Sequence, residues 1–286
     1  MRDKVFVLCV GCQKGATSWL HDQLSMSQHV NLGFTKEYQV FDSLYIPNFD
    51  HFHNKKVARL KRILNKNIEL KEKHFGLLQN INFVLDVESY YNYFDSLWKN
   101  DENITTVGDF TPHYAALPVD AFKEIKAQLQ KRGFRVKVVF IMRDPVERCW
   151  SMVRMRRRNS KKWTPEKPLL PEAKDLKNSY TNKPCELFTR YEESVAKLEA
   201  VFDESELHYS IYENLFEPQS LKKLEEFFQI PDFKPNVEVK VNVSKKSAPK
   251  LPEKLISEIM EFYRPTYEFC GERFNTRDVW KSIKAA

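Results

Sequence analysis

The chain has 286 residues, of which 42% are hydrophobic and 13% aromatic, and its 46 Lys and Arg against 39 Asp and Glu give a formal net charge of +7. This composition is typical of a globular protein with an ample core and excludes a disordered or low-complexity chain. No apolar run approaches the roughly 20 residues of a membrane span, and the N-terminus lacks the anatomy of a signal peptide, so we expect a cytoplasmic protein. The excess of positive charge suits an anionic partner, or simply a soluble surface.

The five cysteines are scattered, which favours reduced thiols over a disulfide framework. Cys9 and Cys12 form one Cys-x-x-Cys pair, but no second pair accompanies it. We therefore expect these two cysteines to pack rather than to bind zinc. No cluster of ligating side chains predicts a metal site.

A phosphate-binding loop is predicted near the start of the chain. Residues 5–10 are apolar and indicate a buried strand, and an amphipathic helix begins near Thr17 after a glycine-containing loop. The loop holds Lys14, and unpaired N–H groups at the helix start favour an anion. An ordinary βα turn with a capping hydroxyl is the alternative. Because Lys14 precedes Gly15 and no hydroxyl follows it directly, this is not a Walker loop.

Strands and helices alternate along the rest of the chain. The further expected elements are a short strand at 30–33, an inserted helical segment within 47–80, a helix at 84–98, a strand at 104–107, a helix at 121–131, a strand at 136–142, a helix at 185–202, a strand at 207–212, a helix at 220–228, an irregular basic segment at 236–250 and a closing helix at 251–274, kinked at Pro265. The alternation predicts one α/β domain over residues 1–286, with a P-loop-like, mostly parallel sheet covered by helices on both faces.

A second anion-binding element is predicted where the second central strand ends. Arg143 follows that strand, Asp144 suits a helix N-cap and Pro145 the first helical turn, which places Ser151 about two turns into the helix. Ligands of open α/β sheets bind outside the carboxyl ends of the strands, where the Lys14 loop also opens. Two separated elements suggest a ligand with two separated phosphate groups. A lone Arg-Asp pair would instead be structural.

Residues 155–184 are rich in Arg, Lys and Pro. They suggest either a basic lid over an acceptor-binding site or a solvated helix end followed by a linker. A nucleic-acid-binding module could use such a run, but it would want interleaved aromatic residues, and the run holds none before Trp163. We therefore expect no nucleic-acid partner.

Together these motifs resemble the sulfotransferases that use 3′-phosphoadenosine 5′-phosphosulfate (PAPS), and most closely the heparan-type and related bacterial carbohydrate branch. Six segments carry the resemblance in the family's order: 14–20, 36–42, 108–114, 143–151, 212–215 and 263–274. The first is similar to the 5′-phosphosulfate loop, the second to the stretch that supplies the catalytic base, and the fourth to the 3′-phosphate motif. The likeness runs from about residue 4 to 275 and omits 47–80 and 155–184.

The resemblance implies transfer of a sulfuryl group to a hydroxyl or amine of a small molecule or saccharide, with no metal and with adenosine 3′,5′-bisphosphate (PAP) as product. Glu37 is the implied general base, with Lys36 beside it, and Lys14 would neutralise the leaving phosphate. The implied donor-binding residues are Lys14, Gly15, Ala16, Thr17, Ser18, Trp19, Arg143, Ser151, Tyr212, Lys245 and Lys246. Candidate acceptor contacts are Gln39, Asp109, Arg154 and His113, the last also being a second candidate base.

The chain departs from the family pattern at three positions. Ala16 stands where Gly is usual, and Ala is tolerated there if its φ is negative, as in a first helical turn. Gln39 stands where the heparan branch often has His, which bears on the acceptor class because Gln cannot exchange a proton. Asp109 replaces the usual Glu.

A small-molecule kinase with a P-loop is the nearest alternative enzyme. It would need glycine, lysine and hydroxyl in an order that Lys14 and Gly15 do not give, together with an acidic strand end for Mg²⁺.

Overall fold

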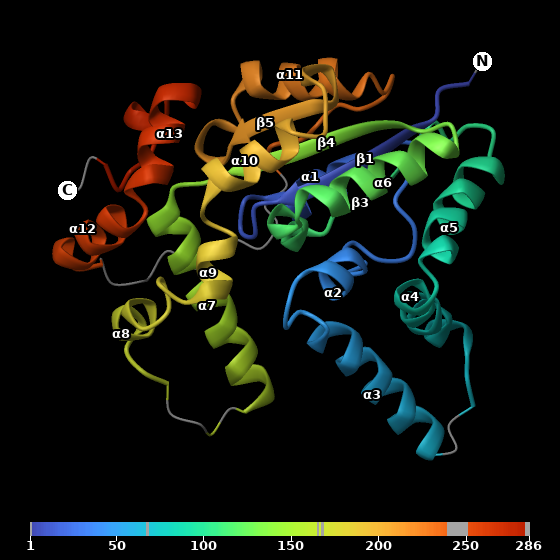
Figure 1. Cartoon of the computed structure of the whole chain (residues 1–286), viewed down its shortest axis with the longest axis horizontal. Helices are drawn as coiled ribbons and strands as arrows, with labels where there is room; N and C mark the ends of the chain where they lie inside the picture. Colours follow the sequence, from blue (N-terminus) through green and yellow to red (C-terminus); the bar gives the residue numbers. More distant parts are fainter. Residues whose placement is uncertain (1, 67–68, 165, 167–168, 239–250, 284–286) are drawn as a thin grey trace.

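The centre of the molecule is a five-stranded sheet in which every pairing is parallel (Figure 1). The computed structural model describes residues 2–66, 69–164, 166, 169–238 and 251–283. The strands are β1 (Val5–Gly11), β2 (Val30–Asn31), β3 (Thr106–Asp109), β4 (Arg135–Met142) and β5 (Leu207–Ile211), in the order β2-β3-β1-β4-β5. This single domain confirms the predicted α/β, P-loop-like fold class.

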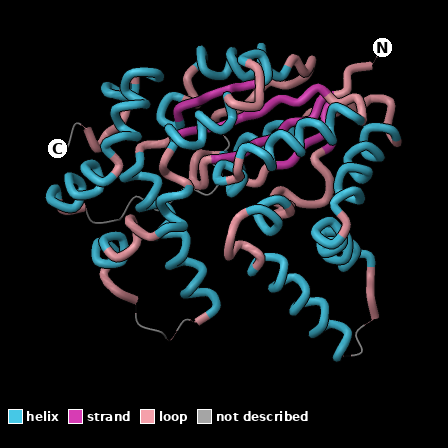
Figure 2. The backbone as a smooth tube through the Cα atoms, viewed as in Figure 1, coloured by secondary structure: helices cyan, strands magenta, loops and turns pink. Residues whose placement is uncertain are grey.

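Helices cover both faces of the sheet (Figure 2). Their bounds are α1 (Thr17–Leu24), α2 (Phe41–Tyr45), α3 (His51–Asn65), α4 (Phe75–Leu85), α5 (Val87–Lys99), α6 (Val119–Lys131), α7 (Pro145–Trp163), α8 (Glu172–Lys177), α9 (Lys183–Leu187), α10 (Tyr191–Glu199), α11 (Pro218–Phe228), α12 (Glu253–Phe262) and α13 (Arg264–Phe274). Short 3₁₀ turns occur at Glu72–His74, Pro112–Ala116, Glu204–Glu206, Tyr212–Asn214 and Thr276–Asp278.

Strand β1 divides the core in two. All seven of its residues are buried, and their side chains alternate between the two faces of the sheet. Phe6, Leu8 and Val10 belong to a large cluster with α5, α6, α10 and α13, whereas Val7 and Cys9 join a smaller cluster with α1 and α11. The continuous apolar run in the sequence is therefore explained by burial on both sides, and Cys9 packs as expected.

Some helix boundaries differ from the predicted ones. The helix expected at 185–202 is two helices, because Thr189 Oγ1 donates to the carbonyl of Cys185 and competes with the helical backbone. The one expected at 84–98 begins after a break at Asp86, whose backbone is extended. The closing helix breaks at Tyr263, two residues before Pro265, as a proline in a helix favours.

Helices α3 and α7 project to the same side of the sheet, away from it (Figure 1). Residues 47–80 hold α3 and the start of α4, and residues 155–163 are the second half of α7. The basic run thus begins as a helix end rather than as a loop. Across the described ranges, no helix combines the length and apolarity needed to span a membrane.

Candidate active site

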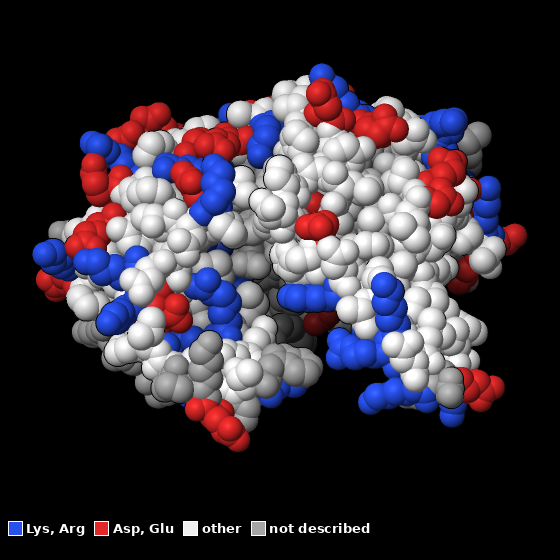
Figure 3. All heavy atoms as spheres, turned by 60° about the horizontal axis from the view of Figure 1, so that its bottom comes forward, with Lys and Arg blue, Asp and Glu red and all other residues white. Residues whose placement is uncertain are grey.

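A cavity of about 930 Å³ opens at the carboxyl ends of β1 and β4. Figure 3 shows the surface hollowed between the α7 side and the α3 side, with Lys and Arg on both. The cavity is lined by Gln13, Lys14, Ala16, Thr17, Ser18, Trp19, Lys36, Glu37, Gln39, Phe52, Pro112, His113, Arg143, Ser151, Met155, Arg158, Asn159, Tyr212, Phe216 and Val237. The structure therefore brings together most of the residues that the sequence singled out, from five separate segments.

The loop between β1 and α1 departs from expectation at Ala16. Its φ is +68° and its ψ 18°, so the condition of a negative φ is not met and the residue adopts the left-handed conformation that favours glycine. Lys14 is also left-handed, with φ +75°. Gly15 does not line the cavity but lets the loop pass β4: a Cβ there would lie 2.7 Å from the carbonyl oxygen of Ile141.

Lys14 is the electrostatic centre of the cavity. Burial, followed by the positive charges of Arg158, Arg143 and Lys36, lowers its pKa from 10.5 to about 8. Its Nζ lies 4.0 Å from Sδ of Met155, and no carboxylate of the described residues lies within ion-pair distance. Four cations, Lys14, Lys36, Arg143 and Arg158, line the described cavity with one carboxylate, Glu37. This excess of positive charge indicates a site for an anion.

Arg143 is fixed at the end of β4 by three contacts. One Nη atom donates to the carbonyl of Lys14 at 3.2 Å, the other lies 3.3 Å from a carboxylate oxygen of Glu147, and the guanidinium stacks 4.4 Å from the ring centre of Tyr212. Its buried Nε has no hydrogen-bond partner among the described residues. The guanidinium nevertheless lines the cavity, so its positive charge acts on whatever occupies it.

Asp144 begins α7 as predicted. Its Oδ1 accepts a hydrogen bond from the N–H of Val146 at 3.0 Å, and Pro145 occupies the first helical turn. The carboxylate is fully buried and also accepts from Tyr267 and Ser282. It is thus structural and does not pair with Arg143.

Lys36 and Glu37 lie in the loop after β2. Lys36 Nζ is 3.0 Å from Oε1 of Glu37 and 3.3 Å from Oγ1 of Thr17, so the pair adjoins the start of α1. The Glu37 side chain is 39% exposed and lines the cavity. This ion pair is open to a ligand on its cavity side.

Two candidate acceptor contacts lie elsewhere. Asp109 is fully buried and accepts hydrogen bonds from the hydroxyls of Tyr90, Thr111 and Tyr114, while burial raises its pKa to about 7. Arg154 pairs with Glu172 at 2.7 Å, outside the cavity lining. Neither residue reaches the cavity, because each is engaged within the fold. Lys245 and Lys246 lie outside the described residues.

Several lining residues escaped the sequence interpretation. Met155, Arg158 and Asn159 follow Ser151 on α7 at spacings of four, seven and eight residues, which is one helix face. Extending that helix through the basic run would have placed them in the site. Phe52 comes from α3, and no local pattern predicts where that helix packs.

No protein-family model and no curated protein sequence matches the chain. Solved structures do resemble it. A sulfotransferase from Alicyclobacillus acidocaldarius is 15% identical, with a TM-score of 0.58 over 95% of this chain and 96% of that one. The sulfotransferase domain from the curacin biosynthetic pathway is 15% identical, with a TM-score of 0.44 over 82% of this chain and 76% of that one. Mouse sulfotransferase SULT7A1 in complex with PAP is 15% identical, with a TM-score of 0.39 over 92% of this chain and 64% of that one. The first of these likenesses shows that this chain has the fold of a sulfotransferase.

Proposed function

We propose that this protein transfers a sulfuryl group from PAPS to a hydroxyl or amine of an acceptor. The observation that carries the proposal is the gathering of Lys14, Lys36, Arg143 and Arg158 around one cavity at the carboxyl edge of the sheet. Such a site suits a ligand with several negative charges, as PAPS has. The fold shared with the Alicyclobacillus sulfotransferase agrees with it.

The two anion-binding elements suit the two ends of the donor. Lys14, Thr17 and Ser18, at the start of α1, are proposed to hold the 5′-phosphosulfate, where the helix N-terminus adds its partial positive charge. Arg143 and Ser151 are proposed to hold the 3′-phosphate. Both residues line the cavity, one at the end of β4 and one on α7, which supports this assignment.

The transfer step needs one base and one stabilised leaving group. The acceptor oxygen or nitrogen forms a bond to sulfur while the bond from sulfur to the bridging phosphate oxygen breaks, and that electron pair leaves on PAP. Glu37 is proposed to take the acceptor's proton, and Lys14 to stabilise the charge on the leaving phosphate. In-line placement of the reactants supplies the remaining rate enhancement.

Titration calorimetry with PAP, AMP, ATP and a single-stranded oligonucleotide tests the proposal. We expect PAP to bind most tightly, and Arg143→Ala to weaken PAP binding far more than AMP binding, because only PAP carries the 3′-phosphate. Tighter binding of ATP with Mg²⁺ would favour a kinase, and tighter binding of the oligonucleotide a nucleic-acid-binding protein. Equal losses for PAP and AMP in the variant would refute the assignment of Arg143.

We further propose a carbohydrate or another polyhydroxylated molecule as acceptor. The cavity has uncharged polar side chains beside its cations, among them Gln13, Gln39 and Asn159. Amide groups both donate and accept hydrogen bonds, which suits hydroxyl groups.

A further inference from the structure

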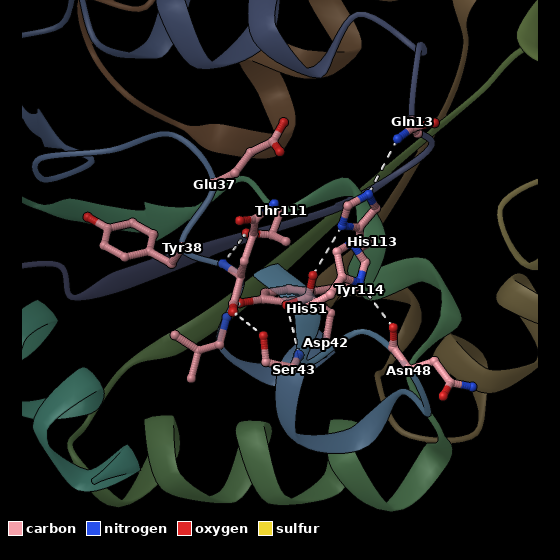
Figure 4. A network of polar contacts seen from close by, with 12 residues as sticks. Gln13, Glu37, Tyr38, Asp42, Ser43, Asn48, His51, Thr111, His113 and Tyr114 are labelled. Atoms are coloured by element: carbon pink, nitrogen blue, oxygen red, sulfur yellow. Dashed lines mark hydrogen bonds and ion pairs between the residues drawn. The ribbon is translucent and has the colours of Figure 1, made fainter. Parts of the chain in front are cut away.

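The cavity contains a histidine that the proposed transfer does not use. His113 lies on the 3₁₀ turn after β3, and 8% of its side chain is exposed. Its Nδ1 is 3.1 Å from Oδ2 of Asp42, whose side chain is fully buried on α2 (Figure 4). A carboxylate only accepts hydrogen bonds, so Nδ1 carries a proton. The other ring nitrogen, Nε2, faces the amide nitrogen of Gln13, which can only donate, so Nε2 presents its lone pair.

Aromatic rings hold the imidazole in place. Phe188 stacks on it with ring centres 5.0 Å apart and planes at 24°, and Phe52 lies at 5.0 Å and 31°. Phe49 meets it edge-on at 5.5 Å. Asp42 therefore sets the tautomer and the phenylalanines set the ring plane, so that the position of Nε2 is fixed before anything binds.

The neighbour of Nε2 has an unused hydrogen-bonding atom. Gln13 Nε2 lies 3.3 Å from Nε2 of His113, and both side chains line the cavity. Oε1 of Gln13 is buried and has no hydrogen-bond partner among the described residues. Because Gln13 lines the cavity, this oxygen is placed to accept from a donor group of a molecule bound there. Nε2 of His113 has one lone pair, and its 3.3 Å contact with the Gln13 amide is long, so a donor group of the same molecule can take the place of that amide.

We propose that His113, held by Asp42, is a positioning residue that accepts a hydrogen bond from a second hydroxyl or amine of the acceptor, beside Oε1 of Gln13. The inference rests on the proposed sulfuryl transfer and deepens it. Glu37 comes from another segment, and its carboxylate lies apart from the imidazole (Figure 4). The acceptor therefore has at least two donor groups, one that reacts near Glu37 and one that binds His113. Sugars and other polyols meet this requirement, and simple phenols or alcohols do not.

Kinetics with two probe acceptors test the inference. Methyl β-D-glucopyranoside offers several hydroxyls and p-nitrophenol offers one. Asp42→Asn supplies an amide N–H that can donate to Nδ1, which turns Nε2 into a donor. For this variant and for His113→Phe, we expect the KM of the glucoside to rise about tenfold, the value of one hydrogen bond, with a smaller change in kcat. His113→Gln retains an acceptor oxygen and should recover part of the loss.

Matched measurements separate this role from a structural one. His51→Phe, at the neighbouring histidine that packs on Phe52 but does not line the cavity, should leave KM unchanged. The Kd of PAP should be the same in all variants, which also shows that they fold. Nitrogen-15 NMR of the unmodified protein should show His113 Nε2 without a proton, and the opposite tautomer would overturn the inference whether or not the variants fold.

The remaining outcomes are also decisive. An unchanged KM for the glucoside in the Asp42 and His113 variants, or an equal KM change for p-nitrophenol, would overturn the role of His113. Binding of PAP without sulfation of the glucoside would overturn it too, while leaving the proposed function in place. Failure to bind PAP would instead remove the proposed function itself.

Discussion

Lys14 should make donor binding depend on pH in a defined direction. Its pKa is lowered from 10.5 to about 8, chiefly by burial and then by the charges of Arg158, Arg143 and Lys36. A bound phosphate would favour the charged ammonium and raise this pKa again. Binding should therefore take up protons on the alkaline side of pH 8.

The magnitude follows from the size of the shift. If PAP binds the ammonium form, the Kd scales with the inverse of the protonated fraction, and it should rise about tenfold between pH 7 and pH 9. Full restoration of the pKa to 10.5 would correspond to about 3 kcal/mol of binding free energy as an upper bound. At pH 8 the uptake should be about half a proton per PAP bound.

Calorimetry in buffers of different ionisation enthalpy measures both the Kd and the proton uptake. The matched control is Lys14→Arg, which keeps its charge throughout this range and should bind PAP with little dependence on pH. Burial also raises the pKa of Glu213, near Arg143, to about 7, and this control subtracts its effect. If the Kd of PAP depended as little on pH in the unmodified protein as in the Lys14→Arg control, the reasoning would be refuted.

The same shift has a consequence for stability. Between pH 8 and 10.5 the unfolded chain holds the Lys14 proton more tightly than the folded one, so stability rises with pH there, and the charge destabilises the fold below pH 8. Lys14→Met should accordingly raise the melting temperature at pH 7. A lower melting temperature would contradict the inference that the Lys14 charge destabilises the fold.

Three further substitutions test separate parts of the structure. Glu37→Gln should leave the Kd of PAP nearly intact while turnover collapses, because only the base is lost; full turnover with the true acceptor would remove Glu37 from this role. Ala16→Gly should stabilise the protein by about 0.5–1 kcal/mol in denaturant unfolding, since φ +68° strains alanine, and a loss of stability would contradict the strain. Asp144→Ala should lower the free energy of unfolding by about 2–4 kcal/mol. The substitution removes the cap of α7 and leaves the buried donors of Tyr267 and Ser282 without an acceptor. A free energy of unfolding close to that of the unmodified protein would show that solvent replaces these contacts.

Much of the fold could be predicted from the sequence because its signals are local. The apolar runs at β1 and β4 are continuous because both sheet faces are covered, and Asp144 and Pro145 mark the start of α7 through capping chemistry. The two elements predicted to bind anions follow their strands directly. Parallel topology then brings them to one edge, so Lys14 and Arg143 could be predicted to share a site.

The tertiary structure decided the features that depend on distant contacts. Ala16 is left-handed next to Gly15, which passes close to β4, and the residue type of Ala16 gives no sign of this conformation. Asp109 accepts from Tyr114 of its own segment and from Tyr90 of α5, and the contact with α5 cannot be read from the motif. Asp42 and His113 are 71 residues apart in sequence and adjacent in space. The sequence by itself therefore determined the sheet, the loop and the cations, since each follows from its neighbours in the chain. Which neutral side chains complete the cavity depended on how α2, α3 and α7 pack, and only the folded chain contains that information.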